Sequence, residues 1–229
     1  MLENIIYNGD SVEGMKNLIE EMGGTIDCIL TDPPYNVSQK SNFHTMGRKG
    51  VDFGEWDKGF DLTSWIEPAL KLLKKGGNIV IFNDWKNMSY IKDELEKHGC
   101  LIKEIIMWQK TNPMPRNRDR LYVTSCEFAI WATKGKGWTY NRQRETYENA
   151  IFRYPVVHHS KRYHVTEKPL ELIKDLVKIH TNENDIVLDP FMGSGTTAVA
   201  CKELRRKYVG FELDKEYHEI SLKRLTDLD

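Results

Sequence analysis

The feature that most constrains the fold is an alternation of short apolar runs with longer segments of helical periodicity. The short runs predict buried strands at Ile5–Tyr7, Ile26–Leu30, Ile79–Phe82, Ile186–Leu188 and Tyr208–Phe211. Apolar residues repeat with the period of an α-helix in Trp65–Lys75, Met88–His98, Pro169–Ile179 and Thr196–Leu204. Gly76-Gly77 and Gly99 predict helix ends. The alternation predicts an α/β fold with a mostly parallel sheet that is covered on both faces.

Two further strand-like segments, Lys103–Trp108 and Glu127–Ala132, are joined by an irregular stretch without a helix. Such a pair is better explained as antiparallel, because a parallel crossover needs a long connection. A length of 229 residues fits one α/β domain. We find no repeat or linker that would divide the chain, and we therefore predict a single domain over residues 1–229.

Composition excludes several classes of protein. The formal net charge is −1, so a nucleic-acid surface would have to be local. The four cysteines are scattered without a C-x-x-C pair, which predicts neither a disulfide framework nor a metal site and fits a reducing cytoplasm. No apolar run approaches the roughly 20 residues that a membrane-spanning helix needs.

Two stretches do not resemble core. Residues 36–61 are rich in Gly, Ser, Asn and charge, and so long a loop in a compact domain is usually functional or disordered. The second stretch, residues 110–162, carries eleven Lys and Arg against four Asp and Glu, with Tyr and Trp interleaved. A charge run is usually a solvated face, but this imbalance with aromatics favours contact with phosphates and bases.

The first motif that carries chemistry is Asp32-Pro33-Pro34-Tyr35, directly after a predicted strand. Two prolines fix the backbone and offer no N–H, so the strand leaves the sheet as a rigid extended tip. An exocyclic base amine is a poor nucleophile, because its lone pair is delocalised into the ring. The Asp32 carboxylate and the Pro33 carbonyl could accept its two hydrogens and stabilise the cationic nitrogen that forms. Tyr35 could stack on a base that has left the duplex.

The second motif lies in Ile186–Ala198, which predicts a strand, a glycine loop from Asp189 and a helix. Gly193 and Gly195 allow close approach to a ligand, and Glu212 follows at the spacing of an acid that bonds ribose hydroxyls. The pattern also satisfies a dinucleotide fingerprint, so a nicotinamide oxidoreductase is a rival. No second nucleotide-binding half follows, and Phe191 stands where a base could stack, although it could equally be a core residue.

The two motifs together resemble the β class of DNA amino-methyltransferases, enzymes typical of bacterial restriction–modification systems. That class has a circularly permuted motif order, with the catalytic tetrapeptide first, the target-reading segment next and the cofactor loop last. The resemblance covers nearly the whole chain. It implies a Rossmann-like S-adenosylmethionine-dependent methyltransferase fold, with a seven-stranded, mostly parallel sheet and one antiparallel strand.

The resemblance also implies roles for individual residues. Asp32, Pro33, Pro34 and Tyr35 match the catalytic motif. His164-x-Thr166-Glu167-Lys168 resembles the element that holds the methionine carboxylate, and Asp10 resembles a contact to the cofactor adenine, although a simple turn residue explains Asp10 equally well. The residues implied for S-adenosyl-L-methionine are Asp10, His164, Thr166, Lys168, Asp189, Phe191, Gly193, Ser194, Gly195, Thr196 and Glu212.

Two segments acquire roles from the same resemblance. Residues 36–61 resemble the mobile loop over the flipped base, and residues 110–162 occupy the target-recognition position. DNA-binding residues are expected at Asn112, Arg116, Arg118, Arg120, Arg142 and Arg144. The implied partner is double-stranded DNA, in the cytoplasm of a bacterium or during phage infection. Members of this class often act beside a restriction endonuclease and often form homodimers.

Three alternatives stay open at this point. Methylation of cytosine N4 suits the same chemistry, but cytosine-directed relatives often carry Ser at the first motif position, so Asp32 favours adenine N6. A nicotinamide oxidoreductase and a DNA-binding module with an inactive site are the others. Methylation of cytosine C5 is excluded more firmly, because none of the four cysteines follows a proline.

Overall fold

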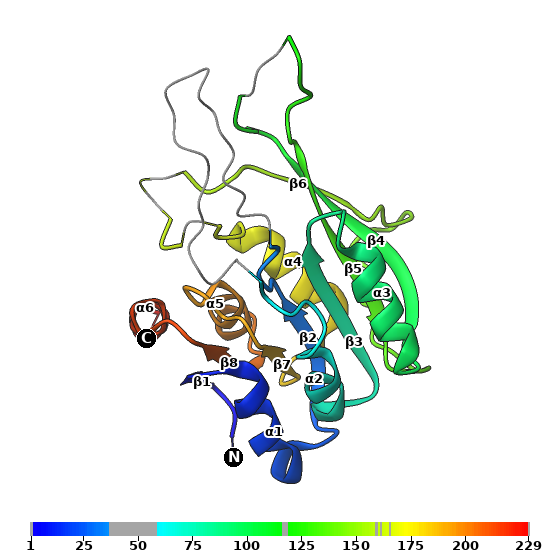
Figure 1. The fold of residues 1–229 in the computed structure, drawn as a ribbon, viewed down its shortest axis with the longest axis vertical. Helices are drawn as coiled ribbons and strands as arrows, with labels where there is room; N and C mark the ends of the chain where they lie inside the picture. Colours follow the sequence, from blue (N-terminus) through cyan, green and yellow to red (C-terminus); the bar gives the residue numbers. More distant parts are fainter. Residues whose placement is uncertain are drawn as a thin grey trace.

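The computed structural model describes residues 2–36, 59–115, 119–158, 160, 162–164 and 166–228. Its framework is one sheet of eight strands in the order β1-β8-β7-β2-β3-β5-β4-β6 (Figure 1). The strands are β1 Ile5–Asn8, β2 Ile26–Thr31, β3 Leu73–Asn83, β4 Leu101–Lys110, β5 Cys126–Thr133, β6 Ile151–Tyr154, β7 Ile186–Asp189 and β8 Lys207–Glu212.

The sheet contains one reversed strand, as predicted. β5 pairs antiparallel with both β3 and β4, whereas the other neighbours pair in parallel. The predicted count of seven strands is wrong, because β6 forms an eighth. β6 pairs with β4 at the sheet edge, with Met107 opposite Ile151, and its residues are exposed or half-buried. A four-residue edge strand of this kind carries almost no apolar periodicity for a sequence pattern to detect.

Six helices cover the two faces of the sheet in the described part of the chain. Helices α1 Ser11–Met22, α2 Ile66–Leu72 and α3 Met88–Lys97 share one hydrophobic core with the sheet. Helices α4 Leu170–His180, α5 Thr196–Glu203 and α6 Lys215–Thr226 contribute to the other. The sheet is therefore buried between two helical layers, which explains the continuous apolar runs of its central strands.

The predicted end of the helix over residues 65–75 is wrong, and the structure shows why. The last three residues of the predicted helix over residues 65–75 belong to β3, which begins at Leu73, and the Gly76-Gly77 pair lies inside this strand. Gly76 has a φ of +79°, and a Cβ there would lie 3.0 Å from the carbonyl oxygen of Gly137. Gly76 permits a close approach of the 134–137 turn, and the pair does not mark the helix end, because α2 ends at Leu72.

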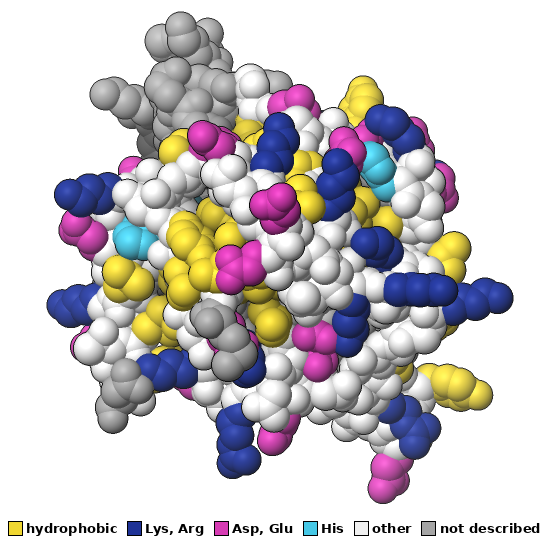
Figure 2. Space-filling view, turned by 90° about the horizontal axis from the view of Figure 1, so that it is seen from below, with side chains coloured by type: hydrophobic (Ala, Val, Ile, Leu, Met, Phe, Trp, Pro, Cys, Tyr) yellow, Lys and Arg dark blue, Asp and Glu magenta, His cyan; other side chains and the backbone are white. Residues whose placement is uncertain are grey.

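The carboxyl ends of β1, β2, β7 and β8 carry residues that the sequence singled out, namely Asp10, Asp32–Tyr35, Asp189 and Glu212. The neighbouring β3 arrow points toward the top of Figure 1. Figure 2 shows the face seen from below, where Lys and Arg alternate with Asp and Glu around an area of hydrophobic side chains. None of the described helices combines the length and apolar character needed to cross a membrane.

Candidate active site

The tetrapeptide lies where β2 leaves the sheet. β2 ends at Thr31, and residues 32–35 continue as irregular backbone in which Pro33 is buried and the other three are half-buried. Asn87, just before α3, donates its side-chain N–H to the Tyr35 carbonyl oxygen at 2.7 Å. The tip is therefore fixed from a neighbouring strand-to-helix connection as well as by its prolines.

Both carboxylate oxygens of Asp32 receive a hydrogen bond. The Tyr35 hydroxyl donates to Oδ1, and the Lys168 ammonium group donates to Oδ2. Lys168 Nζ also lies 3.2 Å from the Tyr35 hydroxyl oxygen. Burial, followed by the negative charge of Asp32, raises the pKa of Tyr35 well above its ordinary value, so the phenol stays a hydrogen-bond donor.

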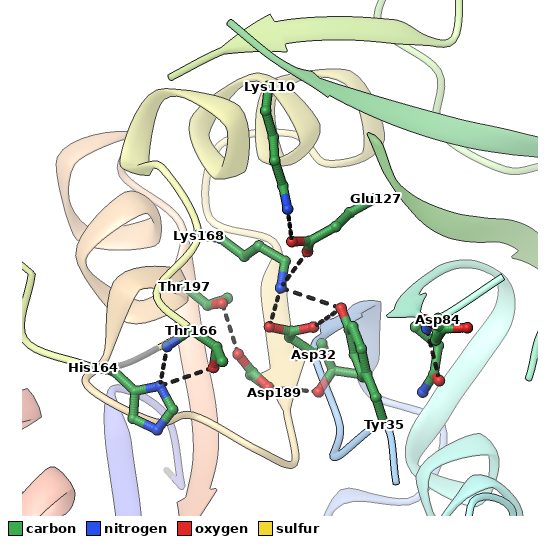
Figure 3. Close-up of polar contacts among 12 residues, drawn as sticks. Asp32, Tyr35, Asp84, Lys110, Glu127, His164, Thr166, Lys168, Asp189 and Thr197 are labelled. Atoms are coloured by element: carbon green, nitrogen blue, oxygen red, sulfur yellow. Dashed lines mark hydrogen bonds and ion pairs between the residues drawn. The ribbon is translucent and has the colours of Figure 1, made fainter. Parts of the chain in front are cut away.

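Lys168 is held by two carboxylates rather than one. Its Nζ lies 3.2 Å from Glu127 Oε2, and Glu127 Oε1 lies 2.7 Å from Lys110 Nζ (Figure 3). Burial alone would lower the pKa of Lys168, but Asp32 and Glu127 raise it above the ordinary value. Burial alone would raise the pKa of Glu127, but Lys168 and Lys110 lower it. Lys168 and Glu127 are therefore both charged at neutral pH.

The glycine loop is anchored by Asp189 at the end of β7. Asp189 Oδ1 accepts from the Thr31 hydroxyl at 2.7 Å and the Phe191 N–H at 3.1 Å, and Oδ2 accepts from the Thr197 hydroxyl at 2.7 Å. Burial raises the pKa of Asp189 to about 6, although these donors oppose the shift. Asp189 thereby ties β2, the loop and α5 together.

The loop itself has two left-handed glycines. Gly193 has a φ of +54° with open space where a Cβ would stand, whereas a Cβ on Gly195 would lie 2.7 Å from Ser221 Cβ. The Gly193 N–H donates to Glu212 Oε2 at 2.7 Å. Burial raises the pKa of Glu212. The open backbone at Gly193 and the adjacent carboxylate form a surface that a hydroxylated ligand could approach.

The polar side chains on the other side of the loop bond to protein groups. Arg224 of α6 donates to the Ser194 carbonyl oxygen at 2.9 Å and to the Ser194 hydroxyl at 3.1 Å. It also donates to the Thr196 hydroxyl at 3.2 Å and forms a 3.0 Å ion pair with Glu167. Ser194 and Thr196 therefore fix the loop against α6 in this structure, and their predicted contact with the cofactor stays a prediction.

Phe191 packs at the edge of a core. Its ring makes edge-to-face contacts with Phe60 and Trp65, at centroid distances of 5.4 and 5.3 Å. Because the residue is only half-buried, one part of the ring packs and another part is accessible. Both interpretations of Phe191, core residue and stacking surface, are compatible with this position.

Asp10 caps α1, because its Oδ1 accepts from the Glu13 N–H at 2.8 Å. It also lines a cavity of about 310 Å³ with Asn8, Gly14 and Phe211. The predicted adenine contact of Asp10 therefore remains compatible with its capping role.

His164 and Thr166 lie together before α4. His164 Nδ1 lies 3.0 Å from the Thr166 hydroxyl, and the imidazole packs on the Tyr217 ring at 4.2 Å between centroids. Burial lowers the pKa of His164, although Asp32 opposes the shift. Lys168, predicted beside them at the methionine carboxylate, points to Asp32 in this structure.

The predicted DNA-binding residues fall into three groups. Arg116 and Arg118 lie outside the described residues, as do residues 37–58 of the predicted mobile loop. Arg120, Arg142 and Arg144 are exposed. The Asn112 side chain bonds both main-chain groups of Val156, accepting from its N–H at 2.6 Å and donating to its carbonyl at 3.4 Å.

The residues that sequence patterns missed are Lys110, Glu127, Asn87 and Arg224. Glu127 and Lys110 occur in the basic segment, where each resembles an ordinary charged strand residue. Their significance comes from the reversed pairing of β4 and β5, which brings both beside Lys168. Only the three-dimensional arrangement could have identified them.

Comparison with known proteins identifies the family of the chain. A family model described as DNA methylase matches residues 26–223. The chain therefore belongs to the DNA methylase family.

Individual relatives span nearly the whole chain. It is 32% identical to the type II methyltransferase M2.MboI of Moraxella bovis, over 97% of this chain and 88% of that protein. It is 29% identical to the type II methyltransferase M.HinfI of Haemophilus influenzae, over 98% of this chain and 69% of that protein. The crystal structure of the M1.HpyAVI–SAM complex superimposes with a TM-score of 0.80 at 40% identity, over 96% of this chain and 98% of that one.

Proposed function

We propose that this chain is a site-specific DNA methyltransferase that transfers a methyl group from S-adenosyl-L-methionine to N6 of a flipped adenine. The observation that carries the proposal is the junction of the two motifs. The Thr31 hydroxyl bonds Asp189, so the strand that leads into the tetrapeptide is fixed to the strand that leads into the glycine loop. A base held by the first motif and a cofactor held by the second would meet at one edge of the sheet.

Asp32 would act on the target amine. Its carboxylate is held by Tyr35 and Lys168, yet each oxygen keeps a lone pair for a further hydrogen bond. Accepting an amine hydrogen there, and another on the Pro33 carbonyl, localises the nitrogen lone pair. A nitrogen prepared in this way would accept the methyl group that bound S-adenosyl-L-methionine supplies, and one of its two hydrogens would then leave as a proton to solvent. Fixed negative charge stabilises the positive charge that develops on nitrogen.

The residues present fit the cofactor. When bound, S-adenosyl-L-methionine supplies an electrophilic methyl group. Glu212 would bond the ribose hydroxyls, because its carboxylate lies beside the open backbone of Gly193. Phe191 would offer its free ring surface to the adenine, and Asp10 would contact the same base. His164 and Thr166 would lie near the methionine end, because the charge of Asp32 acts on His164.

The choice of base rests on smaller points. Asp32 supplies a full carboxylate where cytosine-directed relatives tend to carry a hydroxyl, which supports adenine. The fold itself does not decide, because the PvuII methyltransferase, described as cytosine-N4-specific, has the same fold at 18% identity and a TM-score of 0.73. Cytosine N4 is therefore the alternative target.

The proposed setting is a restriction–modification system. Four of the relatives are type II methyltransferases from bacteria. They support double-stranded DNA as the partner and action inside a bacterial cell. A cognate endonuclease and a homodimer belong to the same proposal. The exposed Arg120, Arg142 and Arg144 would contact phosphates.

The test is transfer of labelled methyl from S-adenosyl-L-methionine to double-stranded DNA by wild type and Asp32→Ala. Wild type should transfer label, and the variant should lose at least ~10²–10³ of the rate, because one preorganised group at the reacting charge is removed. Calorimetry should show similar cofactor affinity for both. An inactive wild type that still binds DNA would favour the binding-module alternative, and substantial turnover by the variant would remove Asp32 from the reaction.

A further inference from the structure

A continuous chain of charged side chains runs from the antiparallel strands to the catalytic tetrapeptide (Figure 3). Lys110, the last residue of β4, contacts Glu127 of β5, Glu127 contacts Lys168, and Lys168 contacts Asp32. We propose that Glu127 and Lys110 are positioning residues for methyl transfer, which hold the Lys168 ammonium group against the Asp32 carboxylate. The inference rests on the proposed role of Asp32 as acceptor of an amine hydrogen.

The burial of these four charged side chains favours a functional role over a structural one. The side chains of Lys168, Lys110, Glu127 and Asp32 are 6, 15, 24 and 25% exposed. Removing charges from water is costly, and a buried ion pair often stabilises a fold no better than apolar residues of similar volume. The three charged groups that lead to Asp32 of the tetrapeptide therefore call for a reason other than stability. Two ammonium and two carboxylate groups also leave the cluster without net charge.

The geometry gives that reason. An Asp carboxylate has a broad torsional preference about its last bond, so its plane must be fixed from outside. Here the Tyr35 hydroxyl fixes Oδ1 and Lys168 fixes Oδ2. A fixed acceptor direction matters, because misplacement of a reacting group by about 1 Å can cost roughly 10²-fold in rate.

Lys168 in turn needs an anchor, because its stem is long and flexible. An ammonium group has three hydrogens, and its three partners are Asp32, Glu127 and the Tyr35 hydroxyl. Lys110 occupies the other oxygen of Glu127 and so fixes that carboxylate. Without the charge of Glu127, the ammonium group would keep one anionic partner and could shift around it.

The test compares Glu127→Gln with wild type in single-turnover methylation at saturating cofactor and DNA, which isolates the chemical step. The rate constant should fall roughly 10- to 100-fold, while calorimetric affinities for S-adenosyl-L-methionine and DNA stay within about twofold. Glu203→Gln is the matched control, because Glu203 forms a partly buried 2.6 Å ion pair with Lys174 on the helices. It should leave the rate unchanged.

A double-mutant cycle separates positioning from independent action. Because Glu127 acts through Lys168, Glu127→Gln should add little to the loss in Lys168→Met. If Lys168→Met does not fold, as judged by thermal unfolding, the cycle of Lys110→Met with Glu127→Gln asks the same question, and it should also be non-additive.

Three results would overturn the inference while leaving the proposed function intact. These are an unaffected single-turnover rate in Glu127→Gln, a loss that falls on cofactor affinity instead of rate, and additive losses in the cycle. A wild-type chain without methyl transfer would instead remove the proposed function, and this inference with it.

Discussion

The backbone N–H of Gly193 donates a 2.7 Å hydrogen bond to Oε2 of Glu212. The bond joins the loop after β7 to the end of β8, and the other carboxylate oxygen accepts from the Asp214 N–H at 2.8 Å. Glu212 is therefore fixed at both oxygens before any ligand arrives, which would place its remaining lone pairs for ribose hydroxyls.

Glu212→Ala should weaken cofactor binding more than it lowers the saturated rate. The ribose bond would exist in ground state and transition state alike, so its loss raises Kd without a matching loss of kcat. Isothermal calorimetry with S-adenosyl-L-methionine measures the effect, and a Kd increase of roughly tenfold or more is expected. Glu3→Ala is the control, since Glu3 pairs with Lys207 at the opposite end of β8. Equal affinities in the two variants would show that Glu212 does not contact the cofactor.

Phe191→Leu should weaken the cofactor while largely preserving the fold. Leucine can fill much of the space against Phe60 and Trp65, but it has no ring face for the adenine. Stacking of a base on an aromatic ring contributes ~1–3 kcal/mol, so Kd should rise by a corresponding factor. The same calorimetry tests this, and thermal unfolding checks the packing. An unchanged Kd with a lowered Tm would mean that Phe191 is only a core residue.

Thr197→Val should destabilise the protein in a pH-dependent way. The pKa of Asp189 lies at about 6 in the folded protein, above its ordinary value of 3.8. A raised pKa means that the folded protein binds the Asp189 proton more tightly than the unfolded chain does. The resulting contribution to the free energy of unfolding is fully present below pH 3.8 and is lost as the pH rises through about 6. The Thr197 hydroxyl supports the ionised form, and such a bond is worth ~1.5–3 kcal/mol. The variant should therefore lose about this much at roughly pH 8 and less at roughly pH 5.

Urea unfolding of wild type and Thr197→Val at the two pH values measures this difference. Thr226→Val is the control, because the Thr226 hydroxyl donates to the neutral Leu222 carbonyl at 3.0 Å. A pH-independent loss in Thr197→Val would contradict a titrating Asp189.

Replacing Arg120, Arg142 and Arg144 together by Ala should flatten the salt dependence of DNA binding. Each phosphate contact contributes ~0.9 to the slope of log affinity against log salt, so the slope should fall by roughly three. Arg142 and Arg144 flank a turn fixed by Glu148, which accepts from the Gln143 and Arg144 N–H groups at 2.6 and 2.8 Å. Lys71, Lys92 and Lys97 of α2 and α3 provide a triple-alanine control. Identical slopes for wild type and the arginine variant would mean that these three arginines face solvent and do not contact phosphates.

The parts of this protein that could be predicted from sequence depend on local patterns. Five strands with continuous apolar runs, the reversed strand β5 and the strand-to-loop transitions at Asp32 and Asp189 all follow from periodicity and turn chemistry. Helices α1 and α6 were not predicted, although Asp10 and Asp214 cap them. The apolar residues of α6 are sparse among charged ones, which explains its omission. In α1, however, apolar residues repeat with a helical period from Val12 to Met22, so this helix could have been recognised. Local patterns indicate where a carboxylate lies along the chain but not what faces it.

The partners of the site residues could not be predicted for this reason. Lys168 and Glu127 are 41 positions apart in the sequence and meet because β5 runs antiparallel at the carboxyl end of the sheet. Arg224 reaches the glycine loop from the last helix. Pairings of this kind depend on strand order and helix placement, which no short motif encodes.

The identity of the methylated base tests the proposed methyl transfer to adenine N6 most directly. Plasmid DNA is incubated with the protein and S-adenosyl-L-methionine, digested to nucleosides and separated by mass spectrometry, with the Asp32→Ala variant as background. We expect N6-methyladenine to be the dominant product of the wild-type protein and to be absent with the variant. Dominant N4-methylcytosine would contradict the assignment of adenine, and DNA without methylated base would contradict the proposed reaction itself.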